Sequence, residues 1–308
     1  MKAVVFAYHN MGIVGLEALI RNEISLAAVF THEDDPMENR WFLSVRQWAN
    51  VRGIPVFSPP DVNEAFWVEK ISQMKPDVIF SFYYRHLLSE KILNLAPSGA
   101  YNLHGSLLPA YRGRVPVNWV LINGEKVTGV TLHFMTKKAD AGDIVGQKKV
   151  EIDFFDTART LFDKLCQAAG ELLDEVLPLI KMGAPPRMPQ SEEKATTFRG
   201  RKPEDGKIDW SKRALAIYHL VRAVTRPYPG AFSFFPDGRK VTVWWCLPDE
   251  RVSFSADMAG SIYLEDRAVY VRAGMGVVRL LEVEIGKEIL TGQAIYEYFE
   301  KMGEVRLS

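Results

Sequence analysis

The chain has 308 residues and a mass of 34.9 kDa, a length that corresponds to two ordinary domains. Hydrophobic residues make up 47% and charged residues 25%, which excludes intrinsic disorder and collagen-like repeats. The 38 basic and 38 acidic side chains balance, so the overall charge does not favour nucleic-acid or membrane-surface binding. Two windows are basic, with 7 basic against 3 acidic residues in 101–150 and 8 against 3 in 199–226. We expect an anionic small molecule at these windows.

Strand and helix patterns alternate in the first third of the chain. The predicted strands are 2–8, 24–31, 54–57 and 77–82, and the predicted helices begin at Gly12 and cover 42–51 and 63–74. This alternation is typical of βαβ units and a parallel sheet. Further along the chain we expect a strand at 99–104, a helix from Pro116 to about Ile122, a hairpin of 129–135 with 144–152, and a long helix at 157–181.

Residues 182–206 lose apolar periodicity and are rich in Pro, Gly and charge, which indicates a linker. We therefore expect a catalytic domain at 1–189, a linker at 190–206 and a smaller domain at 207–308. The second domain begins with a helix at 211–224. Its short strands predict a small β-barrel or sandwich, at 231–235, 241–246, 260–264, 268–271 and 276–283, before a last helix at 290–299.

Cysteine content and apolar runs indicate the compartment. Cys166 and Cys246 are far apart in apolar surroundings, so we expect neither a disulfide framework nor a cysteine-based zinc site. The segment 1–8 is too short and too β-like for a signal peptide. No apolar run approaches the ~18 residues of a membrane helix. The expected protein is cytoplasmic, without membrane insertion.

The densest polar cluster follows the strand at 99–104. Asn102 and His104 are two residues apart, so they project from the same face at the carboxyl end of a strand, where open α/β sheets bind ligands. Histidine suits acid–base chemistry near neutral pH, and an asparagine amide suits an oxyanion. Asp140, in the loop 137–143, could fold back to orient His104. The alternative is structural: Asn102 caps a turn, His104 is a hydrogen-bonded core residue, and the loop is a plain β-turn.

Three other features have weaker functional interpretations. Gly12 and Gly15 follow a strand, as in a dinucleotide fingerprint, but the third glycine is missing, so the pattern favours an anion site at a helix start over NAD binding. The contiguous residues 32–35 predict a solvated loop, and we expect no metal site. Single histidines are interpreted as structural, namely His9, His86, His133 and His219.

Two motifs resemble the signatures of the 10-formyltetrahydrofolate-dependent formyltransferases. The first is Asn-Leu-His-Gly-Ser-Leu-Leu-Pro at 102–109 with Tyr-Arg-Gly-Arg at 111–114, and the second is Thr-Gly-Val-Thr at 128–131 with Ala-Asp-Ala-Gly-Asp at 139–143. The resemblance runs from residue 1 to about 300. It implies a Rossmann-like α/β parallel-sheet domain of formyltransferase fold and a smaller C-terminal, OB-like β-barrel domain.

The resemblance also implies site residues and roles. Asn102 would stabilise the oxyanion, His104 would move the proton, and Asp140 would orient His104 and raise its pKa. The formyl donor, 10-formyltetrahydrofolate, would contact His86, Leu87, Leu88, Arg114, Thr136, Lys137, Lys138 and Ala139. The phosphates of a sugar nucleotide suggest substrate contacts at Gly12, Tyr111, Arg112, Arg199 and Arg201. No metal is implied.

Segments 4–9, 30–32 and 77–87 are similar to the branch of the family that formylates the 4-amine of UDP-4-amino-4-deoxy-L-arabinose in lipid A modification and polymyxin resistance. Known members of that branch continue into a decarboxylating dehydrogenase domain, whereas this sequence stops at Ser308. It is interpreted as a separate formyltransferase or an excised domain. The partners implied are a UDP-aminosugar and folate, without nucleic acid, and a homo-oligomer is compatible with the sequence.

Alternative functions lie inside and outside the family. Another nucleotide-linked 4-aminosugar could be the acceptor. Methionyl-tRNA formyltransferase shares the fold and the three catalytic residues, but it must hold a polyanion, which the balanced charge disfavours. A folate or nucleotide binding module without catalysis is the alternative from another class. A dehydrogenase would need the missing glycine fingerprint.

Overall fold

The computed structural model describes residues 1–34, 39–251 and 258–308, which divide into two compact units. The first unit comprises Met1–Pro116, Val127–Glu151 and Phe162–Arg199, and the second comprises Val117–Lys126, Ile152–Leu161 and Gly200–Ser308. Asp35 and Pro36 of the expected polar loop lie outside the described residues. The expected boundaries at 189 and 206 stay a prediction. In the structure, residues 190–199 belong to the first unit because they pair with its loops.

The first unit contains a seven-stranded mixed sheet with the order β3-β2-β1-β4-β5-β7-β8. The five strands from β3 to β5 are parallel, as the βαβ pattern predicts, whereas β7 and β8 join antiparallel. The expected hairpin therefore extends the sheet beside β5. The strands are β1 (Lys2–Ala7), β2 (Ser25–Phe30), β3 (Val56–Phe57), β4 (Val78–Phe82), β5 (Ala100–His104), β7 (Val127–Phe134) and β8 (Ile144–Glu151).

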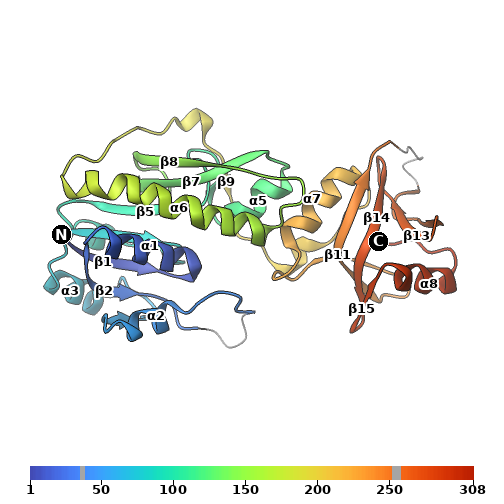
Figure 1. Ribbon diagram of the computed structural model, residues 1–308, viewed down its shortest axis with the longest axis horizontal. Coiled ribbons are helices and arrows are strands. Elements are labelled where there is room, and N and C mark those ends of the chain that lie inside the picture. Colours follow the sequence, from blue (N-terminus) through green and yellow to red (C-terminus); the bar gives the residue numbers. More distant parts are fainter. Residues whose placement is uncertain (35–38, 252–257) are drawn as a thin grey trace. The chain divides into compact units, whose positions relative to one another are not determined.

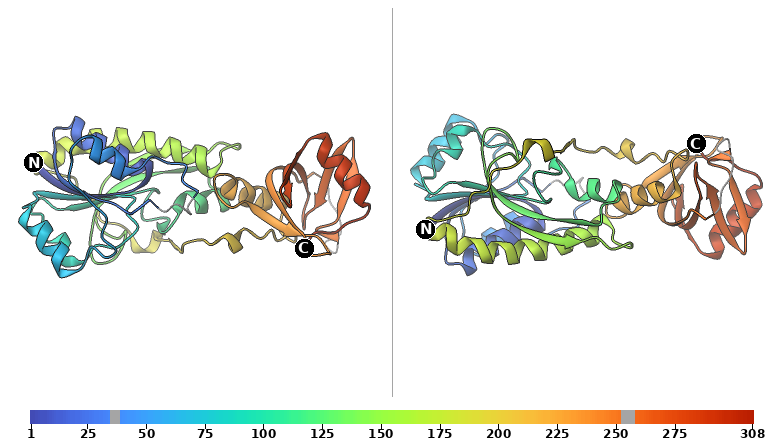
Figure 2. Two further views of the ribbon diagram at one scale, coloured as in Figure 1. Left: turned by 90° about the horizontal axis from the view of Figure 1, so that it is seen from below. Right: turned by 90° about the horizontal axis from the view of Figure 1, so that it is seen from above.

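Helices cover both faces of this sheet. Figure 2 shows α1 and α6 along one face and α3 on the other. The helix α6 packs on α1, where Arg21 and Asp174 form an ion pair of 3.0 Å. The helices of the first unit are α1 (His9–Arg21), α2 (Val45–Val51), α3 (Ala65–Gln73), α4 (Glu90–Leu93) and most of α6 (Ala158–Lys181), whereas α5 (Pro116–Ile122) belongs to the second unit from Val117 onward. The expected start of α2 at Phe42 moves to Val45 because the Ser44 hydroxyl caps the helix by accepting from the Gln47 N–H.

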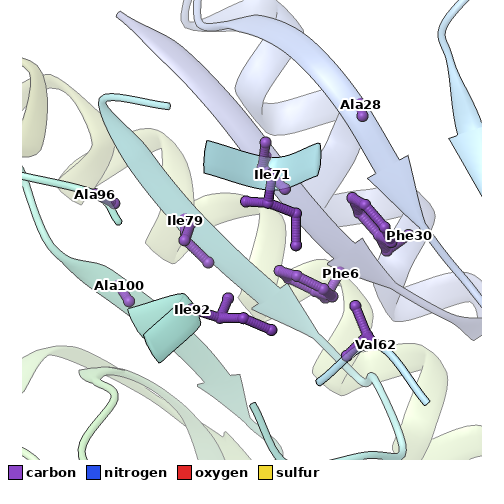
Figure 3. Packing of buried hydrophobic residues seen from close by; sticks show 10 residues of the cluster. Phe6, Ala28, Phe30, Val62, Ile71, Ile79, Ile92, Ala96 and Ala100 are labelled. Atoms are coloured by element: carbon purple, nitrogen blue, oxygen red, sulfur yellow. The ribbon is translucent and has the colours of Figure 1, made fainter. Parts of the chain in front are cut away.

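The core under α3 and α4 holds the parallel strands together. Phe6 of β1 and Phe30 of β2 stack with ring centroids 5.1 Å apart, and Ile71 and Ile92 cover them from the two helices (Figure 3). These side chains are fully buried. Because both faces of the strands are covered, their sequences are continuous apolar runs, as in other buried parallel sheets.

The second unit contains an antiparallel sheet with the order β10-β11-β14-β13-β12, and β15 pairs with β14 (Figure 1). The C-terminal residues 305–308 lie between the two edge strands: Ser308 exchanges backbone hydrogen bonds with Phe234, and Val305 accepts one from Ile262. This segment closes the sheet toward the expected barrel. The strands are β10 (Ala231–Phe234), β11 (Lys240–Asp249), β12 (Ile262–Glu265), β13 (Ala268–Arg272), β14 (Val277–Ile285) and β15 (Glu288–Thr291).

Two helices complete the second unit, α7 (Ala214–Val224) and α8 (Gln293–Met302). The expected helix at 290–299 is partly wrong, because Leu290 is a buried strand residue paired with Val283 and the helix begins only after Gly292. Two short segments from the middle of the chain also belong here. The Asn118 amide donates to the Ala223 carbonyl at 2.7 Å, and the buried Arg222 guanidinium donates to the Asp153 carbonyl at 3.0 Å.

The remaining short elements lie before α7. They are β6 (Arg112–Gly113), β9 (Thr197–Phe198) and two single 3₁₀ turns, η1 (Glu192–Lys194) and η2 (Pro203–Gly206). The strands β6 and β9 form a two-stranded parallel sheet in the first unit.

Candidate active site

The candidate site lies at the carboxyl end of β5, beyond the last parallel strand of the first unit. Asn102 and His104 project from this strand two residues apart, as expected. The His104 side chain is buried, with 6% of its surface exposed, and Asn102 is half-buried. The structure brings Asp140 to the same place from the loop between β7 and β8, with 3.5 Å between its Oδ1 and the Nδ1 of His104.

Both ring nitrogens of His104 face defined groups. Its Nε2 lies 2.8 Å from the carbonyl oxygen of Tyr111. Because a carbonyl only accepts hydrogen bonds, Nε2 carries a hydrogen and Nδ1 is the nitrogen that takes up a further proton. That proton would lie between Nδ1 and Asp140. The Ser106 hydroxyl, which donates to the Ala110 carbonyl at 2.7 Å, holds the same turn.

Asp140 accepts one backbone hydrogen bond and lies against two histidine rings. Its Oδ2 accepts from the Gly113 N–H at 2.9 Å, and its Oδ1 lies 3.6 Å from Nε2 of His133. Burial alone would raise the pKa of the Asp140 carboxyl, but His104, His133 and the Gly113 N–H outweigh it and lower the pKa below its usual value. Asp140 is therefore ionised at neutral pH.

The pKa of His104 is lowered from its ordinary value. Burial is the largest cause, and it is opposed by the negative charge of Asp140 and the Tyr111 carbonyl, while His133 lowers it further. The ring is consequently neutral at pH 7 beside an ionised carboxylate. This is the protonation state that a general base needs, and the carboxylate stabilises the cation that forms when the base accepts a proton.

His133 is a site residue that sequence reasoning classified as structural. It lies on β7 directly opposite Asn102 in the antiparallel register, and its Nε2 accepts from the Asn102 Nδ2 at 3.1 Å. Its Nδ1 donates to the Phe134 carbonyl at 2.8 Å, which assigns the tautomer. The alternation of Thr131 and His133 in an apolar strand was the available signal, but the pairing of this strand with β5 was not predicted.

The expected donor-binding residues form two neighbouring segments. His86 and Leu87 are exposed, Leu88 packs against the core of the first unit, and residues 136–139 are exposed. The ion pair of Lys137 with Glu90, at 3.6 Å, joins the two segments. The side chain of Arg114 is also exposed, and its backbone N–H donates to the Phe198 carbonyl at 3.0 Å. Leu87 is 73% exposed, so an apolar surface is available there.

Two of the five expected substrate contacts need correction. Arg112 is buried, and its guanidinium donates to the Gln190 Oε1 at 2.8 Å and to the Glu192 Oε1 at 2.9 Å, so it is not accessible to a phosphate. Gly12 is the fourth residue of α1, where its N–H donates to the Tyr8 carbonyl at 3.0 Å and an added Cβ would lie 3.2 Å from Ala7. It therefore offers no open N–H to an anion.

The other three expected contacts have surfaces that could still meet a ligand. Tyr111 stacks on Phe198 with centroids 4.8 Å apart. Arg199 is exposed in the first unit, and Arg201 belongs to the second unit, where its guanidinium lies 4.9 Å from the Trp119 ring and donates to the Asp205 carbonyl. Their contact with a sugar nucleotide stays a prediction.

The structure describes residues 1–34, 39–251 and 258–308. Within these ranges no cluster of three or more His, Cys, Asp or Glu side chains has a metal-binding arrangement. No helix in the same ranges combines the length and apolar character needed to cross a membrane.

The chain matches two known domain families. The family described as formyl transferase matches residues 1–177, and the formyl transferase C-terminal domain matches residues 201–299. The first match alone covers more than half of the chain.

Solved structures share the fold at low sequence identity. An N-formyltransferase from Helicobacter canadensis, crystallised with folinic acid and dTDP-3-aminofucose, has a TM-score of 0.70 and 19% identity, over 91% of this chain and 99% of that one. A 4-N formyltransferase from Francisella tularensis has a TM-score of 0.65 and 22% identity, over 79% and 96%. HypX from Aquifex aeolicus has a TM-score of 0.64 and 17% identity over 98% of this chain, which spans only 48% of HypX.

Proposed function

The chain belongs to the formyl transferase family, and we propose that it transfers a formyl group from 10-formyltetrahydrofolate to the 4-amine of UDP-4-amino-4-deoxy-L-arabinose. We infer the reaction type from the cluster of Asn102, His104 and Asp140 at the end of β5. The sugar class is supported by fold neighbours that act on aminosugars, such as the enzyme that holds dTDP-3-aminofucose. The arabinose derivative rests on the sequence similarity of segments 4–9, 30–32 and 77–87.

The residues expected around the donor fit a pterin. A flat ring with a polar edge needs apolar cover and polar atoms within reach. The exposed Leu87 offers apolar cover, and the Ser89 hydroxyl beside it in the chain is buried without a hydrogen-bond partner among the described residues. Asn63 shapes this segment by donating to the Leu87 carbonyl at 3.0 Å and accepting from the Ser89 N–H at 2.7 Å. The bound donor supplies an activated formyl group.

His104 provides the base for the attacking amine. With Nε2 committed to the Tyr111 carbonyl, Nδ1 accepts the proton, and the imidazolium is stabilised by Asp140 at 3.5 Å. Releasing that proton to the departing nitrogen of the donor completes the transfer and restores the neutral ring. The lowered pKa of His104 makes this release favourable.

Asn102 stabilises the charge that develops on the formyl oxygen. One hydrogen of its Nδ2 is donated to His133, which fixes the orientation of the amide. The second hydrogen of Nδ2 remains for the formyl oxygen, because no other acceptor for it is found among the described residues. Such preorganised donors are worth about 100–1000-fold in rate.

The nucleotide phosphates require cations, and the basic window at 199–226 is the candidate source. Arg199 is the proposed phosphate contact of the first unit, with Tyr111 of the same unit at the edge of the sugar site, and Arg201 stays a contact predicted from the sequence. In this assignment the protein works in the cytoplasm, during the lipid A modification that confers polymyxin resistance. The catalytic domain is residues 1–189, and the domain at 207–308 follows the linker.

A second candidate acceptor is a dTDP-linked 3- or 4-aminosugar, favoured by the dTDP-3-aminofucose in the Helicobacter canadensis structure. The test offers 10-formyltetrahydrofolate with UDP-4-amino-4-deoxy-L-arabinose, dTDP-linked aminosugars and methionyl-tRNA, and measures product mass. We expect a gain of one formyl group on the UDP sugar with the highest kcat/KM. Preferred formylation of a dTDP sugar would replace the acceptor, and exclusive formylation of methionyl-tRNA would overturn the sugar-nucleotide assignment.

A further inference from the structure

One side chain outside the three catalytic residues connects both loops of the site. Gln190 follows α6 at a point where the chain runs beside the start of β8, since Met188 and Ile144 exchange backbone hydrogen bonds of 2.9 and 3.0 Å. Its Nε2 donates to the Asp140 carbonyl at 2.9 Å and to the Gly142 carbonyl at 2.7 Å. Its Oε1 accepts from Nε and NH2 of Arg112, at 3.2 and 2.8 Å.

These four hydrogen bonds require an amide. Carbonyl oxygens only accept and a guanidinium only donates, so the partners assign which atom of Gln190 is oxygen and which is nitrogen. A glutamate here would keep the bonds to Arg112 but would face two carbonyl oxygens with a charged oxygen. A methionine of similar volume would keep the packing and lose all four bonds.

The two loops that Gln190 joins have strained backbones. Asp140 has a φ of +53° and Tyr111 a φ of +61°, in the left-handed region that non-glycine residues rarely occupy. Such conformations persist when surrounding contacts enforce them. At Asp140 the enforcing contact is the hydrogen bond from the Gln190 amide. Next to Tyr111 it is the buried side chain of Arg112, which also binds Glu192. Glu192 in turn forms an ion pair of 2.7 Å with Lys138.

We propose that Gln190 is a positioning residue for catalysis, which sets the Asp140 carboxylate and the Tyr111 carbonyl on the two nitrogens of His104. The proposal rests on the function proposed above. Arg112 extends the effect of Gln190 to Tyr111, its neighbour in the chain, and the Gly113 N–H that follows binds Asp140 directly. All four hydrogen bonds of Gln190 are made to groups of the protein, so its role is to position them.

The test compares Gln190→Met and Gln190→Glu with Glu193→Gln, a control at an exposed residue of the same segment. Because a misplacement of ~1 Å can cost on the order of 100-fold in rate, we expect both Gln190 variants to lose roughly 10–100-fold in kcat with little change in KM. The control should retain wild-type kcat. Loss of the Asp140 contact also lowers the pKa of His104, so the acid limb of the kcat profile moves to lower pH.

A second readout is independent of turnover. NMR titration of the His104 ring in the free protein reports its pKa even if no acceptor is formylated. A lower His104 pKa in Gln190→Met, with a folded spectrum and an unchanged control, supports the positioning role. In Gln190→Glu the added negative charge acts in the opposite direction on this pKa, so that variant is judged by its kcat. An unchanged His104 pKa and unchanged kcat in a folded Gln190 variant would overturn it. Failure of wild-type protein to formylate any acceptor, with the pKa shift present, would instead reject the proposed function.

Discussion

Two buried histidines, one in each unit, show what distinguishes a candidate base from a structural ring. His104 and His219 are 6% and 7% exposed, and burial is the largest cause of a lowered pKa at both. His104 faces the carboxylate of Asp140, which opposes burial. His219, on α7, has a pKa lowered to about 4, because burial is reinforced by Arg222 and Lys126 and only partly opposed by Glu250. The charges of the neighbours separate the two, because an anion faces His104 and two cations act on His219.

The largest expected difference between the two histidines is in turnover. His104→Ala should lose about 100–10,000-fold in kcat, since a general base typically contributes that much. Asn102→Ala should lose about 100–1000-fold. His219→Gln should stay within about twofold of wild type, and circular dichroism would verify that each variant is folded. Near-wild-type turnover by His104→Ala would contradict the proposed mechanism. A large loss of turnover in His219→Gln would contradict the interpretation of His219 as a structural residue.

A smaller effect is expected on stability in the second unit. Gly124 has a φ of +70°, and a Cβ built there would lie 2.4 Å from the His219 ring. Gly124→Ala should therefore lower the free energy of unfolding by roughly 1–3 kcal/mol, from backbone strain and displacement of the ring. Chemical denaturation would measure the loss. The control is Gly183→Ala, which shares a positive φ of +73° but has no atom near the added Cβ, and which should lose less. Equal losses would show that the contact with His219 is unimportant.

The smallest expected effect is a pH dependence of stability. The folded pKa of His219 is depressed from 6.5 to about 4, so the unfolded chain binds the proton more tightly than the folded one. Its contribution to stability is complete above pH 6.5 and is lost as the pH falls toward 4. His32, also lowered to about 4, adds to the same window. Between pH 7 and 5 the melting temperature of His219→Gln should fall less than that of wild type. An identical fall in both proteins would contradict the shift at His219.

Local patterns were enough to predict the parallel strands and the principal catalytic cluster. The strands β1, β4 and β5 are buried along nearly their whole length, so their positions are visible as apolar runs. Asn102 and His104 share a face because of the two-residue period of a strand, which needs no tertiary information. The expected second domain built of short strands is also confirmed, although Leu290 lies within the strand β15 rather than in a helix.

Contacts between distant residues were not predictable in the same way. His133 enters the site because β7 pairs antiparallel with β5, and a register depends on two strands at once. Gln190 lies in a segment without periodicity and was interpreted as linker, yet it binds the loops of Asp140 and Arg112. Arg112 was expected to contact the substrate, whereas in the structure its guanidinium is bound by Gln190 and Glu192, 78 and 80 residues away in sequence.

The sequence by itself therefore determined the βαβ alternation, the short strands of the second domain and the Asn102–His104 pair, since each follows from hydrophobic period or neighbouring residues. Tertiary structure decided the distance from His104 to Asp140, the partners of both its ring nitrogens, and the burial of Arg112. The physical reason is that protonation and accessibility depend on charge and solvent around a group. Those surroundings exist only when segments far apart in the chain meet, as Gln190 does with Asp140.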